Sequence, residues 1–241
     1  MNETIQQLMN RKSVRVFTER EITAEEKNAI LRAAVQAPTA GNQQLYTILD
    51  ITDRQLKEKL AETCDRQPMI AEAKTVLVFC ADCKKWYDAF AAAGAEPREP
   101  GAGDFLLAVC DAMIAAQNAV VAAESLGIGS CYVGDIMENY EQQRELLRLP
   151  DYVFPVGMLI FGFPTEGQKQ RPKPDRVDMN FTVRENAYRE MGPEELKAMW
   201  EPHCGVKSYE DWMKAFCSRK YNSDFSREMT RSVREFLKQL A

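Results

Sequence analysis

The chain has 241 residues, of which 45% are hydrophobic and 28% are charged, and its formal net charge at neutral pH is −5. This length and composition suffice for one large globular domain or two small ones. The mild acidity excludes a globally basic surface of the kind that attracts nucleic acid or anionic membranes, so any anion-binding site must be built from local residues.

The cysteines and the N-terminal segment restrict the cellular context. Seven cysteines is an odd number with irregular spacing, and a chain of this length needs no disulfide framework, so we expect reduced thiols. Residues 1–25 lack the apolar segment of a signal peptide, which predicts a cytoplasmic protein. The apolar stretch 105–134 carries polar and charged residues between Asp111 and Glu124, which predicts a buried helix rather than a membrane span.

In the first third of the chain, helix and strand patterns alternate. Thr23 followed by Glu26 forms a capping box, and Pro38 ends the helix that the box begins. The apolar runs that follow are short enough for strands. The predicted elements are, in chain order, a helix over 24–36, a strand over 45–51, a helix capped by Asp53, and a strand over 75–81.

The middle of the chain combines an excursion with a long helix of small residues. Residues 89–103 are rich in Ala, Gly and Pro without an amphipathic period, which predicts a mobile excursion or lid. Asp104 begins a helix of roughly twenty residues with alanines along one face, and Gly127 ends it. Such a face allows close packing, so we expect this helix in the centre of a core or at an interface.

The last part of the chain adds two more strands and several helices. The expected elements are a strand over 131–136, a helix ended by Pro150, a strand over 155–163, a basic irregular segment over 164–184, and helices around 193–200, 208–220 and 224–240. No linker-like composition separates them. We therefore predict one domain, formed by residues 1–190, with residues 191–241 as its helical C-terminal extension.

Two basic segments are candidates for binding an anion. In the heptad RKSVRVF, residues 11–17, the side chains of Arg11, Ser13 and Arg15 share one side of an extended chain, and two guanidinium groups around a hydroxyl suit a phosphate. Lys12 adds an unspecific positive field. A solvated basic turn is the alternative. The second segment, residues 169–176, is held extended by prolines, and a ligand shared by both segments would be anionic.

A small-residue loop could approach a flat ligand. The sequence APTAGNQQ, residues 37–44, lets backbone amides come close, and Asn42 and Gln43 present donor and acceptor pairs that match an imide edge. A loop that merely stops the preceding helix explains the same residues. The segment GIGSCYVGD is excluded as a dinucleotide fingerprint because Tyr132 stands where the third glycine is needed.

Other chemistry finds little support. Cys80 and Cys83 form a C-x-x-C pair that could be a redox dithiol or half of a zinc site, but no second pair exists. His203, next to Cys204, is the only histidine and offers a poor base for a hydrolase. Without a nucleophile, a metal cluster or a phosphate-binding loop, the sequence indicates a bound cofactor that carries the chemistry.

Six segments in order resemble the FMN-dependent nitroreductase family: RKSVRVF, the capped helix, APTAGNQQ, AAESLGIGSCYVGDI, RPKPDR and VRENAYR. The chain is most similar to the branch of NADPH-preferring oxygen-insensitive nitroreductases and flavin reductases. The resemblance implies an α+β fold, with a mixed, mostly antiparallel sheet flanked by helices. It also implies an obligate homodimer with an intertwined C-terminal extension and two FMN sites at the interface.

The resemblance carries functional positions over to this chain. The implied FMN-binding residues are Arg11, Lys12, Ser13 and Arg15 at the phosphate and ribityl chain, Pro38, Thr39, Ala40 and Asn42 in a loop against the flavin, Gln67 at its polar edge, Tyr132, Val133 and Gly134 along the ring, and Lys173 and Arg176 at the pyrimidine or phosphate side. Arg219 matches an arginine that favours NADPH through its extra phosphate. No side chain is expected to be a catalytic acid or base, and no metal is expected. Asp135 and Met137 depart from the Gly and Arg often found in similar proteins.

The implied activity is that of an FMN-dependent NAD(P)H oxidoreductase working by ping-pong. A hydride passes from NADPH or NADH to flavin N5, and the same face then reduces a nitroaromatic, a quinone or a free flavin. Alternatives on the same fold are reductive dehalogenation and flavin fragmentation. A flavin-binding or redox-sensing protein with little turnover is a third possibility. The expected partners are a second copy of the chain and a small-molecule acceptor, with no nucleic acid and no membrane.

Overall fold

The computed structural model describes residues 2–241, which divide into two compact units. The first unit comprises residues 2–171 together with 228–241, and the second comprises residues 172–227. The division expected at residue 190, between a domain and its extension, stays a prediction.

The elements of the first unit are helices and four strands. The helices are α1 (Glu3–Asn10), α2 (Ala24–Val35), α3 (Arg54–Thr63), α4 (Met69–Glu72), α5 (Lys84–Ala92), α6 (Ala102–Ser125), α7 (Tyr140–Leu147) and α8 (Glu166–Gln170). The strands are β1 (Tyr46–Asp50), β2 (Thr75–Asp82), β3 (Gly129–Val133) and β4 (Val153–Gly162), and short 3-10 turns cover Ala40–Asn42 and Gly134–Met137.

The second unit is helical. It contains α9 (Met179–Thr182), α10 (Pro193–Trp200), the 3-10 turn Glu201–His203 and α11 (Tyr209–Lys220). The last helix, α12 (Asp224–Leu237), begins in this unit and continues into the first.

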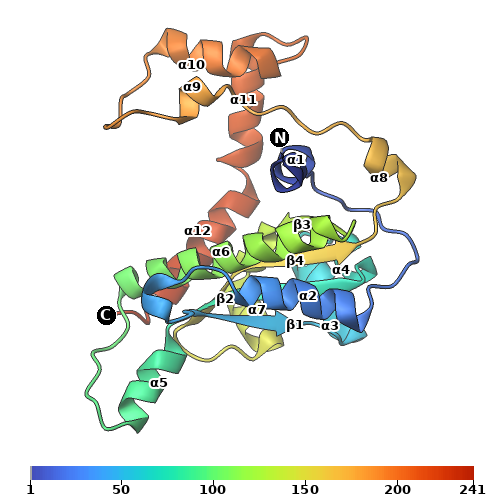
Figure 1. Cartoon of the computed structure of the whole chain (residues 1–241). Coiled ribbons are helices and arrows are strands. Elements are labelled where there is room, and N and C mark those ends of the chain that lie inside the picture. The colour runs from blue at the N-terminus through green and yellow to red at the C-terminus, as the bar shows by residue number, and fades with distance from the viewer. Residues whose placement is uncertain (1) are drawn as a thin grey trace. The chain divides into compact units, whose positions relative to one another are not determined.

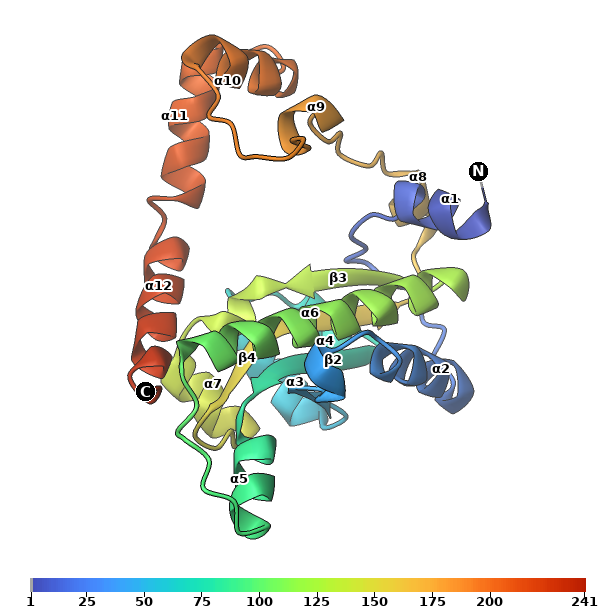
Figure 2. The same ribbon diagram turned by 60° about the vertical axis from the view of Figure 1, so that its left-hand side comes forward.

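The strands form one antiparallel sheet in the order β1-β2-β4-β3, and helices cover both of its faces (Figures 1 and 2). Neighbouring side chains on a strand point to opposite faces. Leu77 and Phe79 of β2 therefore join the core that includes α2 and α6, whereas Val76 and Val78 join the core that includes α3 and α4. Because both faces are covered, β2 and β4 are buried along their whole length. The expected α+β fold with a mostly antiparallel sheet is confirmed.

Helix α6 lies along one face of the sheet, as Figure 2 shows in green. Among the residues that the structure describes, it is the one helix long and apolar enough by composition to cross a membrane. Its alanine face is fully buried in the core, at Ala108, Ala112, Ala115, Ala119 and Ala123. Core packing thus accounts for its apolar character, and the predicted central position is confirmed.

The predicted elements agree with the observed ones to within about three residues at either end, with a few corrections. Residues 89–92 belong to α5, so the excursion expected over 89–103 is wrong in its first part. Trp86 and Phe90 lie one turn apart on α5, with ring centroids 5.3 Å from each other. These two rings give the helix an apolar face, although the alanine-rich sequence around residue 90 shows no amphipathic period. The segment 164–184 contains α8 and α9, and residues 134–136 form a 3-10 turn rather than strand.

The basic heptad lies extended across the end of the β3–β4 pair. Ser13 forms a parallel bridge with Ser130, and the Val14 N–H donates to the Ser130 carbonyl at 2.9 Å. Immediately after the heptad, the Thr18 N–H donates to the Phe163 carbonyl at 2.8 Å. The heptad is therefore attached to both strands and is not a freely solvated turn.

A pair of glycines makes this attachment possible. Gly129 and Gly162 are partners in the β3–β4 register. A Cβ on Gly129 would lie 2.5 Å from the Val14 Cγ2 atom, and one on Gly162 would lie 2.6 Å from the Phe17 ring. Real side chains do not approach so closely. The heptad can therefore take this position only because both strands have a glycine where they face it.

We predict that Gly129→Ala destabilises the protein by roughly 1–3 kcal/mol, because the added methyl group must displace the buried Val14 side chain. Urea unfolding followed by circular dichroism measures the loss. Gly167→Ala in α8 is the matched control, since a Cβ there meets no atom within 4 Å. Equal stability of Gly129→Ala and wild type would show that the heptad does not need this close approach.

Candidate active site

Lys12 ties the heptad to the end of α8 and to the residue that follows this helix. Its Nζ atom donates to the Lys169 carbonyl at 2.6 Å and to the Arg171 carbonyl. The Arg15 N–H donates to Gln168 Oε1 at 3.0 Å. The structure thus brings the first basic segment beside the start of the second, as a shared anionic ligand requires. Because two carbonyl groups already engage the ammonium of Lys12, this residue acts as a structural tie.

Arg11 presents unused donors in a buried position. Its Nε and Nη2 atoms are buried and have no hydrogen-bond partner among residues 2–241, and the same holds for Ser130 Oγ. The guanidinium carbon lies 5.8 Å from the centre of the Tyr132 ring. A buried polar group without a partner costs about 1–3 kcal/mol, and more when it is charged. These atoms therefore suit a ligand with acceptor oxygens, such as a phosphate ester.

The remaining heptad residues surround this position. Ser13 is half-buried, and Arg15 is exposed. Tyr132 and Val133 continue β3 from the Ser130 bridge, and Gly134 begins the 3-10 turn that follows. The predicted strip along a ring thus starts two residues after the point where the heptad meets β3.

Tyr132 lies between the heptad and α6. Its hydroxyl donates to Gln117 Oε1 at 3.3 Å, and burial raises the pKa of Tyr132 to about 12. The phenol therefore stays neutral at physiological pH and acts as a hydrogen-bond donor to Gln117.

The loop 37–44 rests on a different part of α6. The side chain of Asp111, which is 3% exposed, accepts hydrogen bonds from the Thr39 hydroxyl, from the Ala40 N–H at 3.0 Å and from the Leu45 N–H at 3.1 Å. Pro38 and Asn42 are exposed on this loop. Within one chain, the loop 37–44 is thus attached to α6 at Asp111, whereas Tyr132, beside the heptad, is attached to it at Gln117. The structure does not bring these two sets of predicted residues together at the same part of α6.

Gln67 follows α3 and holds its own turn. Its Nε2 atom donates to the Cys64 carbonyl at 2.9 Å, and its N–H donates to the Ala61 carbonyl at 2.9 Å. The side-chain amide is half-buried, with its oxygen in none of these bonds.

A buried carboxyl group follows the turn after Gly134. Glu138 is 7% exposed, and burial, together with the charges of Asp135, Asp65 and Glu228, raises the pKa of Glu138 to about 7. Asp135, which departs from the usual family residue, thus adds negative charge on this side of the turn.

Three predicted residues belong to the second unit. Lys173 is half-buried, Arg176 is exposed and donates from Nη1 to the Pro174 carbonyl at 3.2 Å, and Arg219 is exposed on α11. The guanidinium of Arg219 lies 5.3 Å from the Phe216 ring, at the end of a stack that Phe216 forms with Trp212. Their roles in cofactor or NADPH binding stay predictions.

The cysteine pair is not a reactive dithiol. Cys80 and Cys83 are both buried free thiols, and burial raises the pKa of each to about 12. The thiolate is the reactive form, so neither is activated at neutral pH. Within residues 2–241 no group of three His, Cys, Asp or Glu residues could hold a metal ion.

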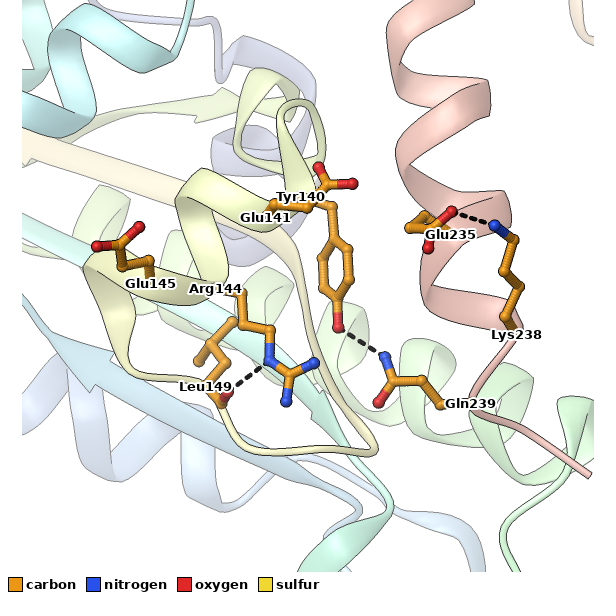
Figure 3. Close-up of a pocket in the computed structure, with 8 residues that line it drawn as sticks. All are labelled: Tyr140, Glu141, Arg144, Glu145, Leu149, Glu235, Lys238 and Gln239. Atoms are coloured by element: carbon orange, nitrogen blue, oxygen red, sulfur yellow. Dashed lines mark hydrogen bonds and ion pairs between the residues drawn. The ribbon is translucent and has the colours of Figure 1, made fainter.

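One cavity lies away from all predicted site residues. It has a volume of about 490 Å³ between α7 and the end of α12 (Figure 3). Its polar groups bond to one another: Gln239 Nε2 donates to the Tyr140 hydroxyl at 2.6 Å, and Lys238 pairs with Glu235 at 2.5 Å. We interpret it as a surface groove between docked elements.

A second cavity, of about 340 Å³, borders the loop 37–44. Gln43 and Leu45 form one wall and α5 another, through Trp86 and Phe90. Trp86 Nε1 donates to the Gln43 carbonyl at 2.6 Å, so α5 also supports the loop.

A model of the nitroreductase family matches residues 8–163. The chain belongs to the nitroreductase family. This nitroreductase is 35% identical over 201 residues to the oxygen-insensitive NADPH nitroreductase of Salmonella typhimurium, over 83% of its own chain and 80% of the relative. It is 33% identical over 190 residues to the FMN reductase (NADPH) of Bacillus subtilis, over 78% and 75% of the two chains.

The nitroreductase fold is shared along the whole chain. The solved structure of the NADPH:FMN oxidoreductase from Vibrio harveyi complexed with NAD+ superposes with a TM-score of 0.83, at 26% identity, covering 98% of each chain. The expected family is therefore confirmed by sequence and by structure.

Asp111 and Ser130 are the residues of this nitroreductase that sequence reasoning missed. Asp111 did carry a signal: an acid in the middle of an alanine-rich core helix must find hydrogen-bond donors when it is buried. Ser130 carried none, because its unpartnered hydroxyl follows from the heptad crossing.

Proposed function

We propose that this nitroreductase is an FMN-dependent NAD(P)H oxidoreductase that reduces nitroaromatics, quinones or free flavins. The observation that carries the proposal is the pair of buried, unpartnered nitrogens of the half-buried Arg11 next to Tyr132, in a chain whose relatives are named FMN reductase and NADPH nitroreductase. The fold, family and site chemistry agree with this activity.

The residues present fit FMN. Nε and Nη2 of Arg11 would donate to phosphate oxygens, the Ser13 hydroxyl would add a short bond, and Arg15 would bring a second positive charge. Lys12 keeps residues 169 and 171 beside the heptad. Lys173 comes two positions after Arg171 in the sequence. Bound FMN supplies hydride transfer, which no side chain of this protein can provide alone.

The protein's own groups bind and orient. The arginines would stabilise negative charge on the cofactor by their fixed charges. The strip from Tyr132 to Gly134 would lie along the ring, and Gln67 would offer its amide oxygen to a polar edge. None of these groups has to exchange a proton with the substrate.

A homodimer accounts for two features of α6. Its outward side exposes Leu106, Leu107 and Ile114 at 64%, 49% and 41%, an apolar stripe that a second copy could cover. Tyr132, which lies beside Arg11 of the heptad, and the loop 37–44 also contact different parts of this helix, at Gln117 and Asp111 respectively. A partner crossing at α6 would bring its loop to the other chain's heptad and complete two sites. We also infer a cytoplasmic location, since the seven cysteines are free thiols.

The purified protein should carry a visible flavin absorption that NADPH or NADH bleaches without oxygen and that a nitroaromatic or quinone restores. Stopped-flow absorbance follows both half-reactions. A protein that binds FMN but is reduced by neither nicotinamide would be a flavin-binding protein rather than a reductase. A colourless protein that takes up no FMN would contradict the proposal altogether.

Arg11→Ala and Arg15→Ala should each weaken FMN binding about ten- to a hundredfold, since a hydrogen bond to a charged group is worth roughly 1.5–3 kcal/mol. Quenching of flavin fluorescence on titration gives the dissociation constant. Arg20→Ala is the control, because this exposed arginine lies just beyond the heptad and pairs with Glu26 at 2.9 Å. If both heptad variants retained FMN fully, the heptad would have a structural role only and would not bind the cofactor.

Ile114→Glu should convert the dimer to a monomer that loses FMN, because two carboxylates would face an apolar contact. Sedimentation velocity measures the mass. Val35→Glu, on the exposed side of α2 at 44% exposure, adds the same charge away from α6 and should stay dimeric. If the Ile114→Glu protein remained a dimer, the exposed side of α6 would not be the dimer interface.

A further inference from the structure

The side chain of Asp111 lies in the core without a basic partner. It is 3% exposed on the buried side of α6. Within residues 2–241 its hydrogen-bond donors are one hydroxyl and two backbone N–H groups, and no cation pairs with it. Burying a carboxylate is costly unless hydrogen bonds compensate it, so this residue needs the groups that it binds.

All three donors come from one loop. Oδ2 accepts from the Thr39 hydroxyl and from the Leu45 N–H at 3.1 Å, while Oδ1 accepts from the Ala40 N–H at 3.0 Å. The Thr39 hydroxyl oxygen in turn accepts from the Gln44 N–H at 2.7 Å. One carboxylate therefore holds the beginning and the end of the loop together.

The backbone between these anchors adopts an unfavourable conformation. Gly41, Asn42 and Gln44 have φ angles of 56°, 59° and 52°. Left-handed backbone is uncommon for residues other than glycine and persists only where the surroundings enforce it. The bonds to Asp111 are positioned to enforce it, since they fix the residues on either side.

We propose that Asp111 is a positioning residue for the cofactor, which fixes the backbone of residues 39–42 in the form that contacts the flavin. This inference rests on the proposed function, because it takes FMN as the ligand of the loop. Asp111 itself, buried beneath the loop, acts only through the loop backbone.

The arrangement requires a carboxylate rather than an amide. An asparagine at this position has one acceptor oxygen and one NH2 group. In either orientation the NH2 group faces a backbone N–H, that of Ala40 or that of Leu45, and one donor loses its acceptor. Asp111→Asn is thus a nearly isosteric change that breaks the anchor.

The test compares four variants by amide hydrogen exchange and FMN titration. In Asp111→Asn and Thr39→Val, the amides of Ala40 and Leu45 should exchange at least about tenfold faster, and FMN should bind about tenfold more weakly, which corresponds to ~1.4 kcal/mol. The flavin midpoint potential should shift in both, because the amide dipoles of the loop are displaced. Thr39→Ser keeps the hydroxyl that bonds to Asp111, so the amides of Ala40 and Leu45 should exchange as slowly as in wild type.

Asn118→Ala is the matched control. Asn118 lies two turns further along α6 and donates from Nδ2 to the Ala33 carbonyl at 3.1 Å, so it holds α2 and not the loop. It should lower the melting temperature while leaving FMN affinity and potential unchanged.

Wild-type affinity and potential in both Asp111→Asn and Thr39→Val, with only a melting-temperature loss like that of Asn118→Ala, would overturn the positioning role. If Asp111→Asn does not fold, Thr39→Val decides the question alone. A wild-type protein that takes up no FMN would instead contradict the proposed function, and the two failures are therefore distinguishable.

Discussion

The crossing of the basic heptad over the Gly129–Gly162 pair is the contact on which the candidate site depends. Val14 and Phe17 occupy the space that two side chains would otherwise fill. This contact fixes the heptad as extended chain, so that alternate residues face alternate sides. Two nitrogens of the Arg11 guanidinium are thereby buried beside Tyr132, while Val14 enters the core. A structural requirement of close packing and a chemical requirement for an anion site are met by the same seven residues.

Helix α6 combines functions that usually fall to separate elements. Its alanine face allows it to pack closely on the sheet, and the one acid in that face binds the loop 37–44. Its outward side carries an apolar stripe that includes Leu106 and Ile114. A single helix thus supports the core, one wall of the proposed cofactor site and the proposed dimer contact, which explains why it contains both small and polar residues.

The end of α12 is firmly integrated into the first unit. Phe236 is fully buried, with ring centroids 4.8 Å from Phe105 and 4.9 Å from Phe154. Arg231 pairs with Glu141 at 2.7 Å, and hydrogen bonds from this guanidinium lower the pKa of Glu141 to about 2. The chain that leaves the first unit at residue 171 therefore returns to it at a defined place, which closes residues 172–227 into a long insertion.

The sequence by itself determined the local elements, the family and the residues to suspect. Capping boxes, strand-length apolar runs and the order of short motifs depend on neighbours in the chain, and these are visible without a structure. Contacts with distant partners leave no such pattern in the sequence. The ammonium of Lys12 bonds to the carbonyl of Arg171, 159 positions away, and so becomes a tie. Asp111 meets the loop 66 to 72 positions before it. Only the tertiary structure could decide these roles, because burial, close approach and the pairing of a charge are properties of residues brought together by folding.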